Sequence, residues 1–143
     1  MKLIGKKVKM TQLWKEDEMV GVTVVKVEES SDISGLKSGD LVKVSGISKG
    51  RGFQGVVKRH GFHGGPKTHG QKNRLRAPGS IGNTTPQRVL PGRKMAGHMG
   101  NVRVSVKNLK VVEINPETRE LLLRGAVPGN RGSRVEVNSV TNN

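Results

Sequence analysis

Hydrophobic positions recur at short intervals in the two end regions of the chain and are sparse in its middle. Residues 20–27 are rich in valine, whose branched side chain favours β-strands. Residues 102–107 alternate between valine and polar residues, so Val102, Val104 and Val106 are expected on one face of a strand. Five more strands, most of them closed by turn residues, are predicted over residues 3–10, 41–44, 109–114, 120–127 and 134–137.

This pattern predicts a mostly β fold. About seven short strands without a long helical repeat are typical of a small, closed or partly closed antiparallel β-barrel. One short helix is expected around residues 53–59. The length of 143 residues allows one domain of ordinary size but not two full ones. We therefore predict a discontinuous barrel domain formed by residues 1–60 and 102–143.

The middle of the chain, residues 61–101, has too few large hydrophobic residues to bury a core. These residues follow no period, and four of the six prolines interrupt the segment. A structureless segment of this length is usually functional or disordered. We predict a long, largely irregular extension, which is either disordered in the free protein or ordered by an outside partner. RNA phosphates and 2′-hydroxyls supply the hydrogen bonds that such a backbone lacks.

The formal net charge of +15 is concentrated in residues 41–112, which we call the acid-free block. This block holds fifteen Lys and Arg, all four His and no Asp or Glu. Residues 1–40 hold seven basic and seven acidic residues, and residues 113–143 hold four of each. Because like charges in such a block repel one another, a polyanion is its expected partner, and RNA is the first candidate.

Composition narrows the class of protein further. The absence of cysteine excludes disulfides, thiolate catalysis and Cys-ligated zinc. No apolar run approaches the roughly 18 residues of a membrane-spanning helix, and the first residues do not follow the signal-peptide pattern. We therefore expect a cytoplasmic protein without a membrane partner.

Residues 50–55 match the Gly-x-Gly-x-x-Gly pattern of nucleotide-binding loops. A dinucleotide site also needs an acidic residue about 20 positions further on, and a kinase-type loop needs a later Asp for magnesium. No carboxylate follows Asp40 until Glu113. We favour the alternative, in which these glycines let the backbone and neighbouring cations approach a phosphate chain closely.

Three histidines, His60, His63 and His69, cluster early in the acid-free block, and His98 follows later. A zinc site needs a fixed set of ligands with carboxylate or carbonyl support, whereas the neighbours here are cations, glycine and proline. Imidazoles that donate to or stack on RNA are the favoured alternative. The block also lacks the paired carboxylates and the nucleophile and base of hydrolases. We therefore expect no metal, cofactor, catalytic residue or small-molecule substrate, and the protein is not expected to be an enzyme.

Recognition of RNA is expected to rest on charge and shape, because Trp14, Phe53 and Phe62 are the only aromatic residues besides histidine. Arg103 and Lys107 have an alternative role, as solvated residues on the exposed face of a strand. The candidate RNA-binding residues are Lys49, Arg51, Lys58, Arg59, His60, His63, Lys67, His69, Lys72, Arg74, Arg76, Arg88, Arg93, Lys94, His98 and Arg103.

Several motifs in a fixed order resemble the large-subunit ribosomal protein three family of bacterial type. They are residues 48–62, 68–70, 76–82 and 94–101, together with 5–12 and 121–129 at the two ends. The resemblance covers nearly the whole chain, and linked motifs are far more specific than any one of them.

The resemblance implies a translation-protein-like β-barrel and an extension, residues 61–101, that penetrates the large-subunit rRNA toward the peptidyl transferase centre. It implies an early role in subunit assembly and a place in the cytoplasmic large ribosomal subunit, where RNA carries the catalysis. The implied neighbours are large-subunit ribosomal proteins fourteen and nineteen. The extension tip is expected within residues 80–87, at Ser80, Ile81, Gly82, Asn83, Thr84 and Thr85.

Two departures from the family are visible. The connection from Glu28 to Gly39 is several dozen residues shorter than in family members, which suggests a shortened member. Asn83 stands where some members carry a methylated glutamine, so that modification is not expected here. The alternative function is a free-standing chaperone or nucleoid-type protein that binds RNA or DNA without a fixed site.

Overall fold

A computed structural model describes residues 2–15, 17–29, 31 and 33–140 of the chain. The chain divides into two compact units. We call residues 1–49 and 101–143 the barrel unit and residues 50–100 the loop unit. The barrel unit contains β1 (Lys2–Lys15), β2 (Glu18–Val27), β3 (Leu41–Ile47), β6 (Arg103–Asn115), β7 (Glu120–Arg124) and β8 (Arg134–Ser139). The loop unit contains β4 (Phe53–Gln54), α1 (Val56–His60) and β5 (Gly97–His98).

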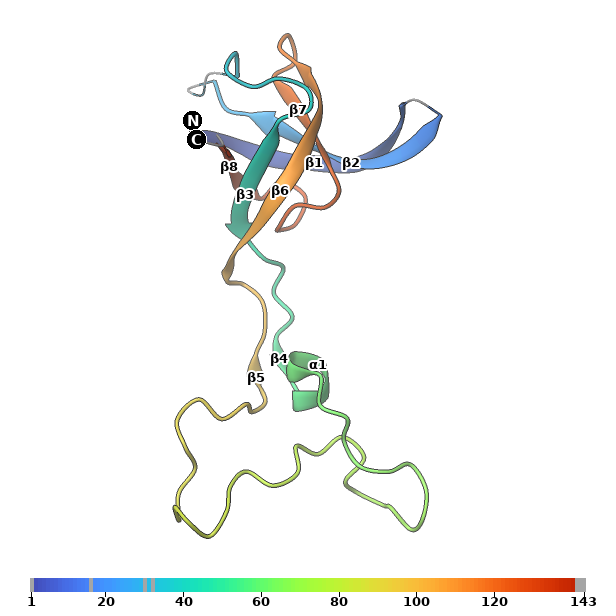
Figure 1. The fold of residues 1–143 in the computed structure, drawn as a ribbon, viewed down its shortest axis with the longest axis vertical. Coiled ribbons are helices and arrows are strands. Elements are labelled where there is room, and N and C mark those ends of the chain that lie inside the picture. Colours follow the sequence, from blue (N-terminus) through green and yellow to red (C-terminus); the bar gives the residue numbers. More distant parts are fainter. Residues whose placement is uncertain (1, 16, 30, 32, 141–143) are drawn as a thin grey trace. The chain divides into compact units, whose positions relative to one another are not determined.

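The barrel closes in the order β1-β2-β7-β6-β3-β8, and every paired strand is antiparallel (Figure 1). This confirms the predicted mostly β, antiparallel fold. The predicted strands over 102–107 and 109–114 are one bent strand, β6. Asn108 adopts a positive φ of 58° within it, and the pairing with β3 shifts opposite this point. A bulge of this kind bends a strand without ending it.

The barrel core is built from alternating aliphatic side chains. Leu121 and Leu123 on β7 are fully buried, whereas Leu122 between them is half-buried. The same alternation places Val135 and Val137 of β8 inside the barrel. Each such side chain contributes roughly 1.5–3 kcal/mol on burial. The other members of the buried cluster are Leu3, Val25, Val27, Leu36, Val42, Val44, Val111 and Val127.

A lysine also lies inside the barrel unit. The side chain of Lys7 is buried, and its Nζ donates hydrogen bonds to the carbonyl oxygens of Val127 at 2.9 Å and Gly129 at 3.1 Å. Gly129 has a φ of +90°, and a Cβ added there would lie 2.8 Å from Cβ of Ser133. Lysine and glycine together therefore fix the turn that leads into β8.

The β1–β2 hairpin is longer than the sequence predicts. The pairing runs to Lys15 and Glu18, and Trp14 pairs with Met19 near the end of the hairpin. Trp14 is 75% exposed and Met19 is 52% exposed. The predicted strand stops at Met10 because residues 11–15 show no hydrophobic alternation, and the structure explains this, since the end of the hairpin covers no core.

The valine face predicted on residues 102–107 does not belong to the core. Val102 is 56% exposed and Val104 is 39% exposed. The core residue of β6 is Val111 instead. Alternation identified the strand correctly, but it does not tell whether the apolar face of that strand is covered.

The boundary between the two units differs from the predicted one. The sequence predicts residues 50–60 as part of the barrel domain, whereas in the structure they group with the loop unit. Phe53 pairs with His98, and the N–H of Arg51 donates to the carbonyl oxygen of Met99 at 2.8 Å. The short helix expected around 53–59 spans 56–60, because Gly61 ends it with a left-handed φ of 73°.

Candidate nucleic-acid interface

The cations of the acid-free block have almost no carboxylate partners. Four ion pairs occur within the described residues, and their three carboxylates, Glu18, Glu28 and Glu136, lie outside the block. Arg103 is the one block residue among them. Its guanidinium donates to Glu136 at 2.6 Å and 3.4 Å, so its charge is largely compensated within the barrel unit. Of the predicted RNA-binding residues, Arg103 is therefore the least available to a phosphate.

The ion pair with Arg103 changes the pKa of Glu136. The hydrogen bond from Arg103 lowers the pKa of its carboxyl group, burial opposes this change, and the charges of Arg103 and Lys2 add to the lowering. Lys2 approaches the same carboxylate at 3.5 Å. Glu136 therefore stays ionised below the usual range of a glutamate and holds Arg103 in place.

Two predicted RNA-binding residues have a clear structural role. The Nη1 of Arg59 donates to the carbonyl oxygen of Met95 at 2.7 Å, and Nε2 of His60 lies 2.9 Å from the same oxygen. The guanidinium of Arg59 also packs on Gly97, where an added Cβ would lie 2.6 Å from Nη1. Both side chains thus join α1 to the segment that leads into β5.

A further predicted residue, Arg93, donates to the carbonyl oxygen of Ser80 and so joins the two sides of the predicted tip. Within the tip, the Ser80 hydroxyl donates to the Gly82 carbonyl at 2.8 Å, and the N–H of Thr84 donates to the Asn83 side chain at 2.8 Å. Residues 80–90 are exposed throughout. The tip is therefore held by local polar contacts rather than by a core.

The other predicted residues make no side-chain hydrogen bond or ion pair within the described part of the chain. All are exposed, and they lie in the loop unit except for Lys49, the barrel-unit residue that precedes it in the chain. No carboxylate in the described residues pairs with the lysines and arginines among them. These predicted residues are Lys49, Arg51, Lys58, His63, Lys67, His69, Lys72, Arg74, Arg76, Arg88, Lys94 and His98.

Sequence reasoning missed a small group of cations on the barrel unit. Lys15, Lys110 and Arg124 line a hollow of about 250 Å³ together with Glu18. Glu18 and Arg124 are 3.6 Å apart. Lys15 and Arg124 come from regions whose charges balance in the sequence, so no composition signal marks them. The pairing of β1 with β2 and of β2 with β7 brings them together.

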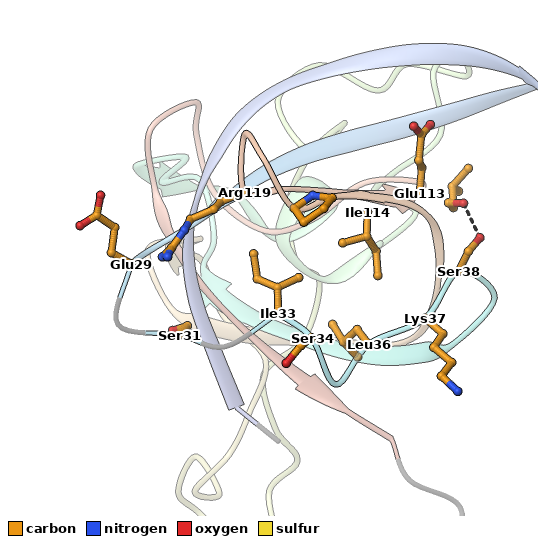
Figure 2. A pocket seen from close by; sticks show the side chains of 12 residues that line it. Glu29, Ser31, Ile33, Ser34, Leu36, Lys37, Ser38, Glu113, Ile114 and Arg119 are labelled. Carbon is orange, nitrogen blue, oxygen red and sulfur yellow. Dashed lines mark hydrogen bonds between the residues drawn. The ribbon is translucent and has the colours of Figure 1, made fainter.

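A larger cavity of about 870 Å³ lies at one end of the barrel unit and has a different character. Figure 2 shows Ile33, Leu36 and Ile114 around its interior. Glu29 and Glu113 balance Lys37 and Arg119 in its lining, so the cavity lacks the positive surplus of the block. The hydroxyl of Ser38 donates to the Val112 carbonyl at 2.6 Å, and Nη1 of Arg119 is buried without a hydrogen-bond partner.

Within the described residues, no group of three His, Asp or Glu side chains is arranged to hold a metal ion. None of the described helices has the length and apolar character needed to span a bilayer.

The fold and charges define a small antiparallel β-barrel that carries a cationic, carboxylate-free loop unit between two of its strands. The model of the family described as ribosomal protein L3 matches residues 2–129. The chain therefore belongs to the ribosomal protein L3 family, as its motifs indicate.

Similar proteins carry the name large ribosomal subunit protein uL3. One from Thioalkalivibrio sulfidiphilus is 57% identical over 103 residues, which are 71% of this chain and 48% of that protein. One from Chloroherpeton thalassium is 50% identical over 133 residues, covering 90% of this chain and 61% of the relative. One from Dehalococcoides mccartyi is 48% identical over 120 residues, with coverages of 83% and 58%. The chain thus spans about half the length of the curated relatives it matches.

Proposed function

We propose that this chain is a structural constituent of the cytoplasmic large ribosomal subunit and binds large-subunit rRNA through its acid-free block. The observation that carries the proposal is the loop unit. It holds ten Lys and Arg without any carboxylate, and Val56 is the only buried hydrophobic side chain among its residues. Such a segment gains little from its own packing, and RNA phosphates supply the charges and hydrogen-bond acceptors that it lacks.

Family membership supports the same function, because the relatives are named as proteins of the large ribosomal subunit. In this proposal the barrel unit anchors the chain, and residues 61–101 extend into rRNA toward the peptidyl transferase centre with the tip at 80–87. The chain supports early subunit assembly and contacts large-subunit proteins fourteen and nineteen. It positions RNA and carries out no reaction itself.

The basic residues divide into two groups within this proposal. Arg59, His60 and Arg93 are held by main-chain carbonyl oxygens and shape the loop unit. The unpaired cations, such as Lys72, Arg74 and Arg76, are free to meet phosphates. Most protein–nucleic-acid hydrogen bonds go to phosphate and sugar and fix position rather than sequence. The unpaired cations therefore supply the affinity for RNA, while Arg59, His60 and Arg93 hold the loop unit in the shape that presents those cations.

Sucrose-gradient fractionation of cell extract, before and after a moderate salt wash, tests the proposal. We expect the chain to migrate with the large subunit at one copy per subunit and to resist the wash. Ribonuclease treatment of a parallel sample serves as the control, because it should release the chain. Migration in the free fractions, or a smear removed by the wash, would refute ribosomal membership and favour a free-standing RNA or DNA chaperone.

A further inference from the structure

Residues 61–79 of the loop unit fold back on themselves around a hollow of about 520 Å³. This volume falls within the range of pockets that hold small organic groups, roughly 300–1,000 Å³. All of its lining residues come from this one segment. The inference drawn from it rests on the proposed function, since it concerns what part of the RNA the loop unit recognises.

Two adjacent glycines close this segment where its two arms cross. The N–H of Gly65 donates to the Leu75 carbonyl oxygen at 3.1 Å. Gly64 has a φ of +76°, and a Cβ added there would lie only 2.0 Å from the same oxygen. A Cβ on Gly65 would lie 2.8 Å from the Arg74 carbonyl oxygen. The hollow therefore depends on glycine at both positions, and it does not need a hydrophobic core to exist.

The walls of the hollow combine flat apolar surfaces with hydrogen-bonding groups. Phe62, Pro66, Ala77 and Pro78 supply the apolar part of the lining. His63, Gln71 and Arg74 supply the polar part. Phe62, Gln71 and Ala77 are half-buried, whereas most of the segment is exposed.

Phe62 is held on one side by a neighbouring ring. Its centroid lies 6.0 Å from that of His60, with the two planes tilted by 45°. His60 is itself fixed by the Met95 carbonyl oxygen at 2.9 Å. An aromatic ring held in this way presents a defined surface rather than a mobile one.

We propose that this hollow accepts one unpaired nucleobase of RNA. A base has a flat π-face that stacks on Phe62 and the proline rings, and an edge that bonds to His63 and Gln71. The surrounding segment carries His63, Lys67, His69, Lys72, Arg74 and Arg76 and no acidic residue. This charge suits the phosphates next to a base and disfavours a cationic protein segment as the occupant.

Ultraviolet crosslinking of the full chain to large-subunit rRNA, taken from the cells that make it, tests this site. Mass spectrometry of the digested complex locates the peptide that carries a nucleotide, and reverse transcription locates the base. We expect one rRNA position to crosslink to the peptide containing Phe62. Phe62→Leu should lower this yield about tenfold, because stacking on the ring is lost. Phe53→Leu is the matched control, since Phe53 is 76% exposed and lies outside the hollow.

A second pair of variants tests the shape of the hollow. Gly64→Ala should lower the crosslink as Phe62→Leu does, because the methyl group meets the Leu75 carbonyl oxygen. Gly70→Ala introduces a side chain at a nearly equal φ of +77° but has open space around it, so it controls for backbone strain. This variant should keep the crosslink.

Filter binding of the same samples distinguishes failure of the base site from failure of the proposed rRNA-binding function. Two results would overturn the base site but leave the proposed function intact, provided that the chain still retains rRNA on the filter. One is a crosslink yield that is unchanged in Phe62→Leu and Gly64→Ala. The other is a set of crosslinks spread along residues 61–79. A crosslink from the hollow to a protein in assembled subunits would also overturn the base site. Failure of the chain to retain rRNA at all would refute the proposed function.

Discussion

The ammonium group of Lys7 donates a hydrogen bond to the carbonyl oxygen of Val127 at 2.9 Å, across 120 positions of the sequence. A second bond to Gly129 fixes the same turn. Replacing Lys7 with methionine keeps the methylene stem but leaves two carbonyl oxygens without their partner. We expect Lys7→Met to lower the free energy of unfolding by about 1–3 kcal/mol. Urea unfolding followed by circular dichroism measures this, with the exposed neighbour Lys9→Met as the control. Equal stability of the two variants would contradict the role of Lys7.

The same lysine predicts an alkaline pH dependence. Burial, and secondarily the charge of Lys49, lowers the pKa of Lys7 below its usual value of 10.5. Between the folded pKa and 10.5 the unfolded chain binds more protons than the folded one, so the Lys7 contribution to stability rises with pH. We expect wild-type stability relative to Lys7→Met to increase over this window. A constant difference between the two proteins would contradict the pKa change.

Glu136 predicts a dependence on the acid side. Its pKa is lowered, chiefly by the hydrogen bond from Arg103, so its contribution to stability is present above the usual glutamate range and is lost as the pH falls through the folded pKa. Glu136→Gln should therefore flatten the fall in stability at pH values below 4.5, the usual pKa of a glutamate. Thermal unfolding of both proteins at a series of acidic pH values measures the difference. Parallel curves would show that Arg103 does not perturb Glu136.

Glu136→Gln should also change RNA binding. Removing the carboxylate frees Arg103, the one residue of the acid-free block whose charge is otherwise compensated by an ion pair within the described residues. We expect the variant to bind rRNA more tightly, with a salt dependence steeper by about one phosphate contact. Filter binding at several salt concentrations measures both quantities. An unchanged slope would mean that Arg103 faces away from RNA.

Three unpaired cations of the loop unit, Lys72, Arg74 and Arg76, are expected to contact phosphates. Changing all three to glutamine should reduce the magnitude of the salt slope by about 3. The control removes the same charge from Lys9, Lys26 and Lys37, which are exposed residues outside the block. Equal losses in the two triple variants would show that net charge alone, and no particular segment, determines affinity.

The barrel unit should fold without most of the loop unit. Its buried cluster draws every member from residues outside 50–100. Replacing residues 71–93 with a short Gly-Ser linker should leave the thermal transition of the barrel within a few degrees, since no buried side chain is removed. The shortened chain should fail to enter large subunits efficiently. Loss of a cooperative transition would show that the two units depend on each other.

Much of the barrel was predictable because its strands bury one face. Leu121, Leu123, Val135 and Val137 follow that rule and mark their strands. The end of the β1–β2 hairpin was not predictable, since Trp14 and its neighbours bury nothing. Where pairing alone holds a strand, the hydrophobic pattern carries no signal.

The candidate site, like the barrel, has features that the sequence predicts and features that only the fold reveals. The absence of carboxylates marked the whole block, because charge is a property of composition. The sequence did not separate Arg59 and His60 from Lys72, because all are basic residues without an acidic neighbour. Only the fold brings Met95 within hydrogen-bonding distance of Arg59 and gives that residue a structural role. The crossing at Gly64 and Leu75 was hidden for the same reason.

The salt dependence of binding between the full chain and large-subunit rRNA tests the central claim most directly. If about half of the fifteen cations in the acid-free block meet phosphates, the slope of log affinity against log salt should be about −5 to −7. A slope in this range is the predicted result. A slope near zero would contradict the claim that the block is a surface for rRNA phosphates.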